Sequence, residues 1–371
     1  MKKWLDKAFN TAILQKSRMA WVDYLRGIAI ILVCYRHVLL GLQNTNLTVP
    51  QSLVTANMIF FSFRMPLFFI LSGIFINGSL KRHPFRKVLY TRFENLLYPY
   101  FIWAFIQLTL QIVLSRYSNS DRTAHDYLYI FYQPRALDQF WYLPALFNTT
   151  LVYLLLKVKA RVPGWAQLIL GVGFYLLAPH IDKISMLSDW MQYYIFYALG
   201  DNISEIFFRP KIQAFLNSPW TLPALTPVFI VSQVYYVSQA PTGPVPIGQA
   251  PNIGEVPFLI IALIGCLTMF ALAFRLQKWD VMRFLRVLGF HSLYIYVIHV
   301  LVAAFVRAIL MKVFGVHNSV ILLACGLFFG VTVPVIIYNL FIKDNFAWFL
   351  FSLKKPDKKS SKNTPREAMS A

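Results

Sequence analysis

Apolar residues in this chain form long runs, each separated from the next by a short polar or basic segment. About 20 apolar residues suffice for a helix to cross the hydrocarbon core of a bilayer. The predicted membrane helices lie at about 21–42, 53–78, 88–114, 141–157, 165–179, 188–208, 213–238, 256–274, 290–312 and 319–342. The pattern therefore predicts an all-α fold, a polytopic membrane protein with about ten transmembrane helices.

Basic residues gather in alternate connections between these runs. Most of the 35 Lys and Arg residues lie at 1–20, 81–92, 157–161, 209–211, 275–286 and beyond 342. Because basic connections remain on the cytoplasmic side, both termini are expected in the cytoplasm. The predicted organisation is a cytoplasmic interfacial arm at 1–20, a transmembrane bundle at 21–345 and a basic, disordered cytoplasmic tail at 346–371.

Composition narrows the class further. The chain is 58% hydrophobic and 13% charged, which excludes an ordinary soluble domain of 371 residues. A net charge of +20 would suggest nucleic acid as a partner of a soluble protein, but here the basic residues flank apolar runs and face the lipid bilayer and its anionic head groups. No binding of nucleic acid is expected. No spacing of His, Cys and carboxylates is typical of a metal site, so no metal is expected.

The first span carries ionisable residues that are costly inside a membrane. It reads WVDYLRGIAIILVCYRHVLLGL and includes Arg26 and His37. At about 100° per residue, their spacing brings the two to within about 20° of one helical direction. They stand roughly 16 Å apart along the axis, one toward each side of the membrane. Since an intramembrane charge costs about 2.5–3.5 kcal/mol, the pair is a functional-site hypothesis.

Polar residues recur in the second and fourth spans. Arg64 is predicted near mid-membrane beside Pro66, and Ser72 lies deeper in the same span. Ser72 permits either close helix packing or room for a slender ligand. Trp141 opens the fourth span within FWYLPALF. It fits either the aromatic belt of a membrane protein or a stacking platform for a sugar ring.

A second polar stripe is predicted in the ninth span, LGFHSLYIYVIHV. Ser292 and His299 are seven positions apart and therefore share a helical face, with Tyr296 close by. The alternative for His299 is a purely structural hydrogen bond between helices.

Taken in order, these motifs resemble the membrane-bound acyltransferase 3 family. The arginine and histidine of that family's first helix, with ten residues between them, correspond to Arg26 and His37, and its Met-Pro and Ser-Gly signature is similar to RMPLFFILSG. Further similarities are the segment from Arg92 to Pro99, the motif FWYLPAL, and the pattern formed by Gly289, Ser292, Tyr296 and His299. Where many relatives place a histidine before Met-Pro, this chain has Arg64, so the role of that histidine is not carried over.

The resemblance implies an O-acyltransferase in the cytoplasmic (inner) membrane of a bacterium. Such an enzyme moves an acyl group, most simply acetyl, from cytoplasmic acyl-CoA (acetyl-CoA) to a hydroxyl of an extracytoplasmic glycan or lipid-linked sugar. His37 would be the general base, or alternatively an acyl carrier, since imidazole suits proton transfer near pH 7. Arg26 would hold the donor. The expected substrate-binding residues are Arg64, Ser72, Trp141, Ser292, Tyr296 and His299.

Two alternatives remain open at this point. A non-catalytic transporter or flippase would also bury charge within its bundle. Transporters often show paired halves with broken helices at matching positions, and that pairing is not evident here. The other alternative is an enzyme of the same family that uses a longer acyl group, such as succinyl, or a lipid or small-molecule acceptor.

Overall fold

The computed structural model describes residues 2–15, 19–45, 47–115, 122–240, 251–343 and 345–354. Within these ranges the chain is helical and has no β-strand, which confirms the predicted all-α fold class. Seven stretches are long and apolar enough to cross a membrane. They are α2 (Ala20–Gln43), α3 with α4 (Gln51–Ile59, Phe61–Arg82), α5 with η2 and α6 (Phe85–Arg92, Phe93–Leu97, Tyr98–Val113), α9 with η6 (Gly164–Leu177, Ala178–Ile181), α13 (Glu255–Trp279), α15 (Ser292–Lys312), and α16 with η7 (Ser319–Ile337, Tyr338–Ile342).

The predicted count of ten spans is not confirmed. An eighth span is present if α11 (Pro210–Asn217) and α12 (Thr221–Ser238), bent by 71°, count as one. The other two predicted runs form α8 (Tyr142–Leu154) and α10 (Ser185–Phe207). The helix α8 continues directly into the π-turn η5 (Leu155–Lys159), and Lys157 and Lys159 lower the hydropathy of this run. Three acidic residues lower the hydropathy of α10. The cytoplasmic location of the termini stays a prediction.

Apolar side chains cover the outward faces of the candidate spans. Phe105, Ile169, Val231, Phe305 and Phe328 are each more than half exposed. Soluble proteins rarely display apolar surface on this scale, so these faces are expected to contact lipid. The structure thus supports a multi-pass integral membrane protein.

The chain divides into two compact units, and each is described by itself. Unit 1 comprises residues 1–67 and 209–340, and unit 2 comprises residues 68–208 and 341–371. Shorter helices complete them: α1 (Lys2–Phe9), η1 (Thr11–Gln15) and α14 (Phe284–Phe290) in unit 1, and η3 (Ala124–Leu128), α7 (Tyr129–Tyr132), η4 (Pro134–Leu137), η5 (Leu155–Lys159) and η8 (Phe346–Leu350) in unit 2.

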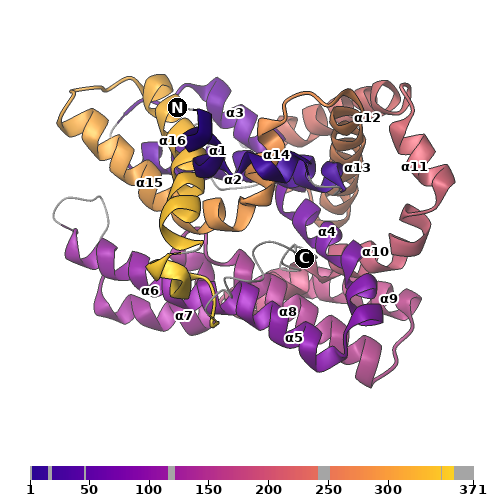
Figure 1. The fold of residues 1–371 in the computed structure, drawn as a ribbon. Coiled ribbons are helices and arrows are strands. Elements are labelled where there is room, and N and C mark those ends of the chain that lie inside the picture. The colour runs from indigo at the N-terminus through magenta and orange to yellow at the C-terminus, as the bar shows by residue number, and fades with distance from the viewer. Residues whose placement is uncertain are drawn as a thin grey trace. The chain divides into compact units, whose positions relative to one another are not determined.

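In unit 1 the helix α2 is the common packing partner. It contacts α13, α14, α15 and α16, and α15 lies alongside α16 (Figure 1). The helices α2 and α14 approach closely because each has a glycine at the contact. A Cβ at Gly27 of α2 would clash with the backbone of Leu285, and a Cβ at Gly289 of α14 would clash with the backbone of Asp23. These small residues let the two backbones approach closely, as is typical inside membranes.

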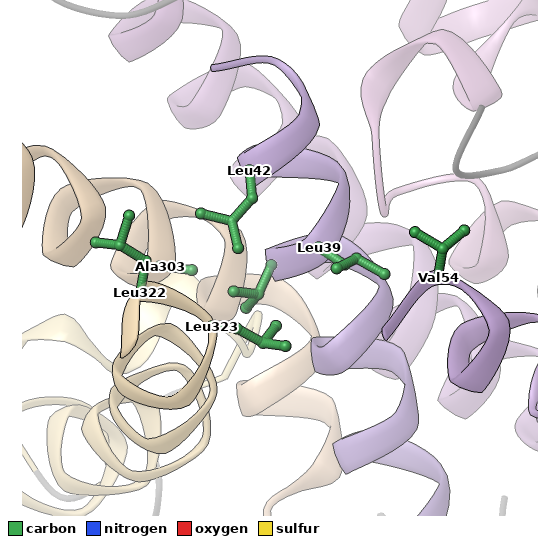
Figure 2. Close-up of a cluster of buried hydrophobic side chains, with 7 residues drawn as sticks. Leu39, Leu42, Val54, Ala303, Leu322 and Leu323 are labelled. Atoms are coloured by element: carbon green, nitrogen blue, oxygen red, sulfur yellow. The ribbon is translucent and has the colours of Figure 1, made fainter. Parts of the chain in front are cut away.

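A buried apolar cluster fills unit 1 around the later turns of α2. Figure 2 shows Leu42 on α2 extending toward the side on which the α15 and α16 side chains lie, and Leu39 extending toward Val54 of α3. The cluster consists of Val38, Leu39, Leu42, Val54, Ala303, Leu322 and Leu323. This packing fixes the part of α2 that carries His37.

In unit 2, α10 packs against α8 and α9. The helices α4 and α10 cross at two glycines, since a Cβ at Gly73 would clash with the Tyr197 carbonyl and one at Gly200 with the Ile70 carbonyl. The centre of the unit is rich in tyrosine, and the side chains of Tyr153, Tyr175, Tyr194 and Tyr197 are almost entirely buried.

The two predicted terminal segments are partly described. In the arm, α1 is held by the Asn339 side chain, whose Nδ2 donates to the Ala8 carbonyl at 2.9 Å. In the predicted tail, η8 is ordered, and its Leu350 carbonyl accepts a 3.1 Å hydrogen bond from Trp103 Nε1 within unit 2. Residues 355–371 of the tail lie outside the described residues.

Candidate functional site

Two predicted site residues meet inside unit 1. His37 lies in the later half of α2 and is half-buried, while His299 on α15 is fully buried. Their ring centroids are 5.2 Å apart and the rings are inclined by 66°. The packing of α2 against α15 therefore brings together residues that are far apart in sequence.

The hydrogen bonds of His299 define how its ring can act. Nδ1 lies 3.0 Å from the Ile295 carbonyl oxygen and 2.8 Å from the Tyr296 carbonyl oxygen. Because a carbonyl oxygen only accepts, Nδ1 must carry the hydrogen. Nε2 is buried and has no hydrogen-bond partner among the residues that the structure describes. In its neutral form this ring is therefore an acceptor at Nε2, in edge contact with His37.

Arg64 ties α4 to α2 at the same level. Its Nη1 donates to the Leu32 carbonyl oxygen at 3.0 Å and to Asn57 Oδ1 at 3.2 Å, and the side chain is 3% exposed. Arg64 therefore has a structural contact whatever else it does. Asn57 was not predicted from the sequence, although it is a polar residue in an apolar run, two helical turns before Arg64.

Cations surround the later half of α2. Arg36 and Arg64 act electrostatically on His37, and both guanidinium groups lie over the ring of Phe61, at 5.4 Å and 5.9 Å from its centroid. One turn beyond His37, the Arg307 guanidinium fills the space that a side chain at Gly41 would need. This concentration of positive charge favours the binding or formation of an anion.

Arg26 belongs to a different level of the helix. Since α2 is continuous from Ala20 to Gln43, Arg26 and His37 share a face as predicted and lie about 16 Å apart along the axis. Arg26 is 5% exposed and Asp23, one turn earlier, is 1% exposed. The close contact with α14 occurs at this level, so Arg26 is held in a packed part of the unit.

The other two predicted residues of unit 1 lie on α15. Tyr296 is buried, with its ring centroid 6.3 Å from that of His299. Ser292 is the first residue of α15 and is half-buried. Its seven-residue separation from His299 corresponds to about 10 Å along the helix axis.

The two predicted residues of unit 2 have packing roles. Ser72 is 3% exposed and adjoins Gly73, where α4 and α10 cross closely. The Trp141 ring is covered by the Arg135 guanidinium at 4.6 Å, with Tyr193 tilted against it at 5.4 Å. That covered face cannot stack on a sugar unless Arg135 moves.

Arg135 was not predicted from the sequence. Its guanidinium forms an ion pair with Asp189, which is 1% exposed, and donates to Gln192 Oε1 at 3.3 Å. Within the described ranges no group of three or more His, Cys, Asp or Glu side chains could hold a metal ion.

The chain was compared with models of known protein families. A family model described as an acyltransferase domain, that of the acyltransferase 3 family, matches residues 19–339. The chain belongs to the acyltransferase 3 family. No curated protein and no solved structure matches it. As a member, this acyltransferase 3 protein is an acyltransferase in the general sense, with an acyl donor and an acceptor, and the matched range contains His37, His299 and both units' predicted residues.

Proposed function

We propose that this acyltransferase 3 protein transfers an acyl group, most simply acetyl, from cytoplasmic acyl-CoA to a hydroxyl of an extracytoplasmic glycan or lipid-linked sugar. The observation that carries the proposal is the contact between His37 and His299, 5.2 Å between centroids, in a helix pair surrounded by cations. An acid–base group beside positive charge is the combination that acyl transfer requires.

In the proposed reaction His37 is the general base. The acceptor hydroxyl oxygen attacks the thioester carbonyl carbon while His37 takes the hydroxyl proton. The resulting oxyanion collapses, the carbon–sulfur bond breaks, and the imidazolium of His37 returns its proton to the departing thiolate. The products are the acylated acceptor and free CoA. The positive charges of Arg36 and Arg64 would stabilise the oxyanion.

His299 is proposed to position His37. With its own hydrogen at Nδ1, His299 offers Nε2 to an N–H of His37 after a small change in ring orientation. That bond would direct the other nitrogen of His37 toward the acceptor hydroxyl, as the orienting member of a catalytic set does. The edge contact of the two rings supports this role.

The remaining residues are assigned to the substrates. Arg26 would hold or orient the donor, whose phosphates suit a guanidinium group. Placed about 16 Å from His37 along α2, it would contact the donor at a different level from the thioester. The other proposed substrate-lining residues are Ser72, Trp141, Ser292 and Tyr296.

The test is acyl transfer by the full chain reconstituted in proteoliposomes, with radiolabelled acetyl-CoA and an acceptor glycan. His37→Ala should lower kcat/KM by about 10²–10⁴-fold, the usual contribution of a general base. His317→Gln is the matched control, since His317 is an exposed histidine outside the helices. Arg26→Lys should weaken acyl-CoA binding and leave the rate at saturating donor closer to that of the wild type.

Two results would contradict the proposal. Wild-type turnover by His37→Ala at equal amounts of folded protein would remove the base. Unchanged affinity of Arg26→Lys for acyl-CoA, measured by equilibrium binding, would remove the donor role of Arg26. If acylated His37 is trapped by intact mass spectrometry before acceptor is added, His37 is an acyl carrier instead of a base.

A further inference from the structure

Unit 2 contains a polar cavity that the acyl-transfer proposal does not use. Its volume is about 200 Å³, and it lies where the ends of α4, η5 and α10 meet the start of α9. Its lining includes Asn77, Tyr153, Lys157, Gln167, Asp201 and Glu205. By the predicted orientation the cavity opens at the cytoplasmic boundary of the membrane.

The floor of the cavity is built around Asp201. One carboxylate oxygen, Oδ2, accepts a 2.5 Å hydrogen bond from the Tyr153 hydroxyl and also bonds the Lys157 ammonium. The other oxygen, Oδ1, is buried and has no hydrogen-bond partner in the described part of the chain. The side chain is 5% exposed. A buried carboxylate oxygen left in this state is costly, so the folded site requires a donor there.

The other lining groups make hydrogen bonds that do not reach Asp201 Oδ1. The Gln167 nitrogen donates to the Val162 carbonyl, and its oxygen accepts from Tyr194. The Asn77 amide nitrogen donates to Glu205 Oε1 at 3.4 Å. At the rim, Lys81 donates to the same oxygen at 3.3 Å. The carboxylates of Asp201 and Glu205 therefore keep acceptor capacity, and among the described residues no N–H or O–H group donates to Asp201 Oδ1.

The chemical class of the group that donates to Asp201 Oδ1 follows from its charge and its hydrogen-bond donors. A phosphate anion brings acceptors, whereas Asp201 Oδ1 needs a hydrogen-bond donor. A divalent cation takes six or more oxygen ligands, and two carboxylates line the space. A primary ammonium group supplies three N–H donors and a positive charge in a volume that the cavity accommodates.

We propose that this cavity binds a primary ammonium group, with Asp201 Oδ1 and Glu205 as its acceptors. The group belongs to an amino-phospholipid head group of the adjoining leaflet or to a soluble amine. In the lipid case the phosphate beside the ammonium would reach toward the exposed Lys81 at the rim. The site is separate from the proposed catalytic residues and does not depend on the acyl-transfer proposal.

The experiment measures thermal unfolding and binding of the full chain in detergent with added phosphatidylethanolamine. The comparison lipids are its N-monomethyl, N-dimethyl and trimethyl (phosphatidylcholine) forms, which keep the charge and lose N–H donors one by one, and phosphatidylglycerol, which has no ammonium. Stabilisation should fall along the methylation series and be absent for phosphatidylglycerol. Free ethanolamine separates a soluble amine from a lipid.

Variants test the assigned acceptors. Losing a hydrogen bond to a charged group typically weakens binding by about 10- to 100-fold, and this range is expected for Asp201→Asn. Because Asp201 also bonds Tyr153 and Lys157, that variant could fail to fold, so Glu205→Gln at the rim is the second variant, with a loss nearer 10-fold. Asp182→Asn, an exposed acid of unit 2 outside the cavity, should bind like the wild type.

Equal stabilisation by phosphatidylethanolamine, phosphatidylcholine and phosphatidylglycerol would overturn the ammonium assignment. The assignment would also be overturned if Glu205→Gln and a correctly folded Asp201→Asn both bound phosphatidylethanolamine with the affinity of the wild type. Stabilisation by free ethanolamine equal to that by phosphatidylethanolamine would support the ammonium site and assign it to a soluble amine.

Discussion

Two buried sites, one in each unit, differ in how their cations are held. At His37 in unit 1, the cations Arg36 and Arg64 act electrostatically on the ring, and Arg64 donates to a carbonyl oxygen and to an amide oxygen. In unit 2, the cations Arg135 and Lys157 are each paired with a buried carboxylate, Asp189 and Asp201. The first site places positive charge beside a histidine ring, whereas in the second each of these cations meets a carboxylate.

The two sites are therefore suited to different roles. A buried ion pair contributes little net stability, but removing one partner is strongly destabilising because the other charge is left uncompensated. Cations beside a histidine ring can instead stabilise negative charge that appears during a reaction. Unit 2 is therefore expected to respond to mutation mainly through stability, and the histidine pair of unit 1 mainly through rate.

The largest effect on the free energy of unfolding should come from breaking the ion pair between Lys157 and Asp201 in unit 2. Asp201→Ala leaves the Lys157 ammonium and the Tyr153 hydroxyl without their acceptor. Since Lys157 is 28% exposed, water relieves part of the cost, and the free energy of unfolding should fall by about 2–4 kcal/mol. Equilibrium unfolding in mixed micelles measures it. The double variant Asp201→Ala with Lys157→Met should recover part of the loss, and failure to recover any would show that the ion pair is not the cause.

His299→Phe should act on rate. A phenyl ring has no acceptor at the position of Nε2, so His37 loses its proposed orienting partner, and kcat should fall by about 10- to 100-fold with the KM for acyl-CoA nearly unchanged. Folding is expected to persist because a phenyl ring is planar, close to imidazole in size, and buries no polar atom. Steady-state kinetics in proteoliposomes separate the two parameters. A loss of stability with an unaltered kcat would make His299 a structural residue and erase the contrast between the units.

The sequence was sufficient for the all-α class, because the length of an apolar run is a local property. The face shared by Arg26 and His37 followed from the periodicity of one helix, whereas the roles of the polar residues in the first, second and ninth spans stay predictions. The count of spans was less certain because α8 runs into a basic turn and α10 carries acids that pair inside unit 2, as with Asp189 and Asp201.

Contacts between distant helices were beyond local reasoning. The approach of His299 to His37 depends on how α15 packs against α2, and the cover of Trp141 by Arg135 depends on where the short helix η4 holds Arg135, which pairs with Asp189 of α10. From the sequence, Ser72 fitted either close helix packing or room for a slender ligand. Only the tertiary structure places the Tyr197 backbone against the neighbouring Gly73.

A smaller effect is expected at Arg64. Arg64→Lys keeps the charge but cannot hold both the Leu32 carbonyl and Asn57 Oδ1 with the geometry of a guanidinium group. The loss of one of these bonds should lower the free energy of unfolding by about 1 kcal/mol. Asn57→Ala should have a similar effect, and the two changes should combine to less than their sum because they share one bond. Full additivity in equilibrium unfolding would disprove the coupling. A larger fall in kcat for Arg64→Lys than for Asn57→Ala would show that the guanidinium group affects the rate beyond its bond to Asn57.

The smallest effect should be found at the exposed ion pair of unit 2. Lys81 and Glu205 approach to 3.3 Å, but their side chains are 68% and 69% exposed. Because water and salt screen such a pair, Lys81→Ala should change the free energy of unfolding by less than about 1 kcal/mol, and that change should shrink at high ionic strength. Unfolding at low and high salt measures both. If burial determines the response of unit 2, Lys157→Ala must cost distinctly more than Lys81→Ala under the same conditions, since only Lys157 compensates the buried carboxylate of Asp201. If Lys157→Ala and Lys81→Ala lowered the free energy of unfolding equally, burial of the carboxylate would not determine the stability of the ion pairs in unit 2. The contrast with unit 1 would then lie in the sign of the charges and not in their burial.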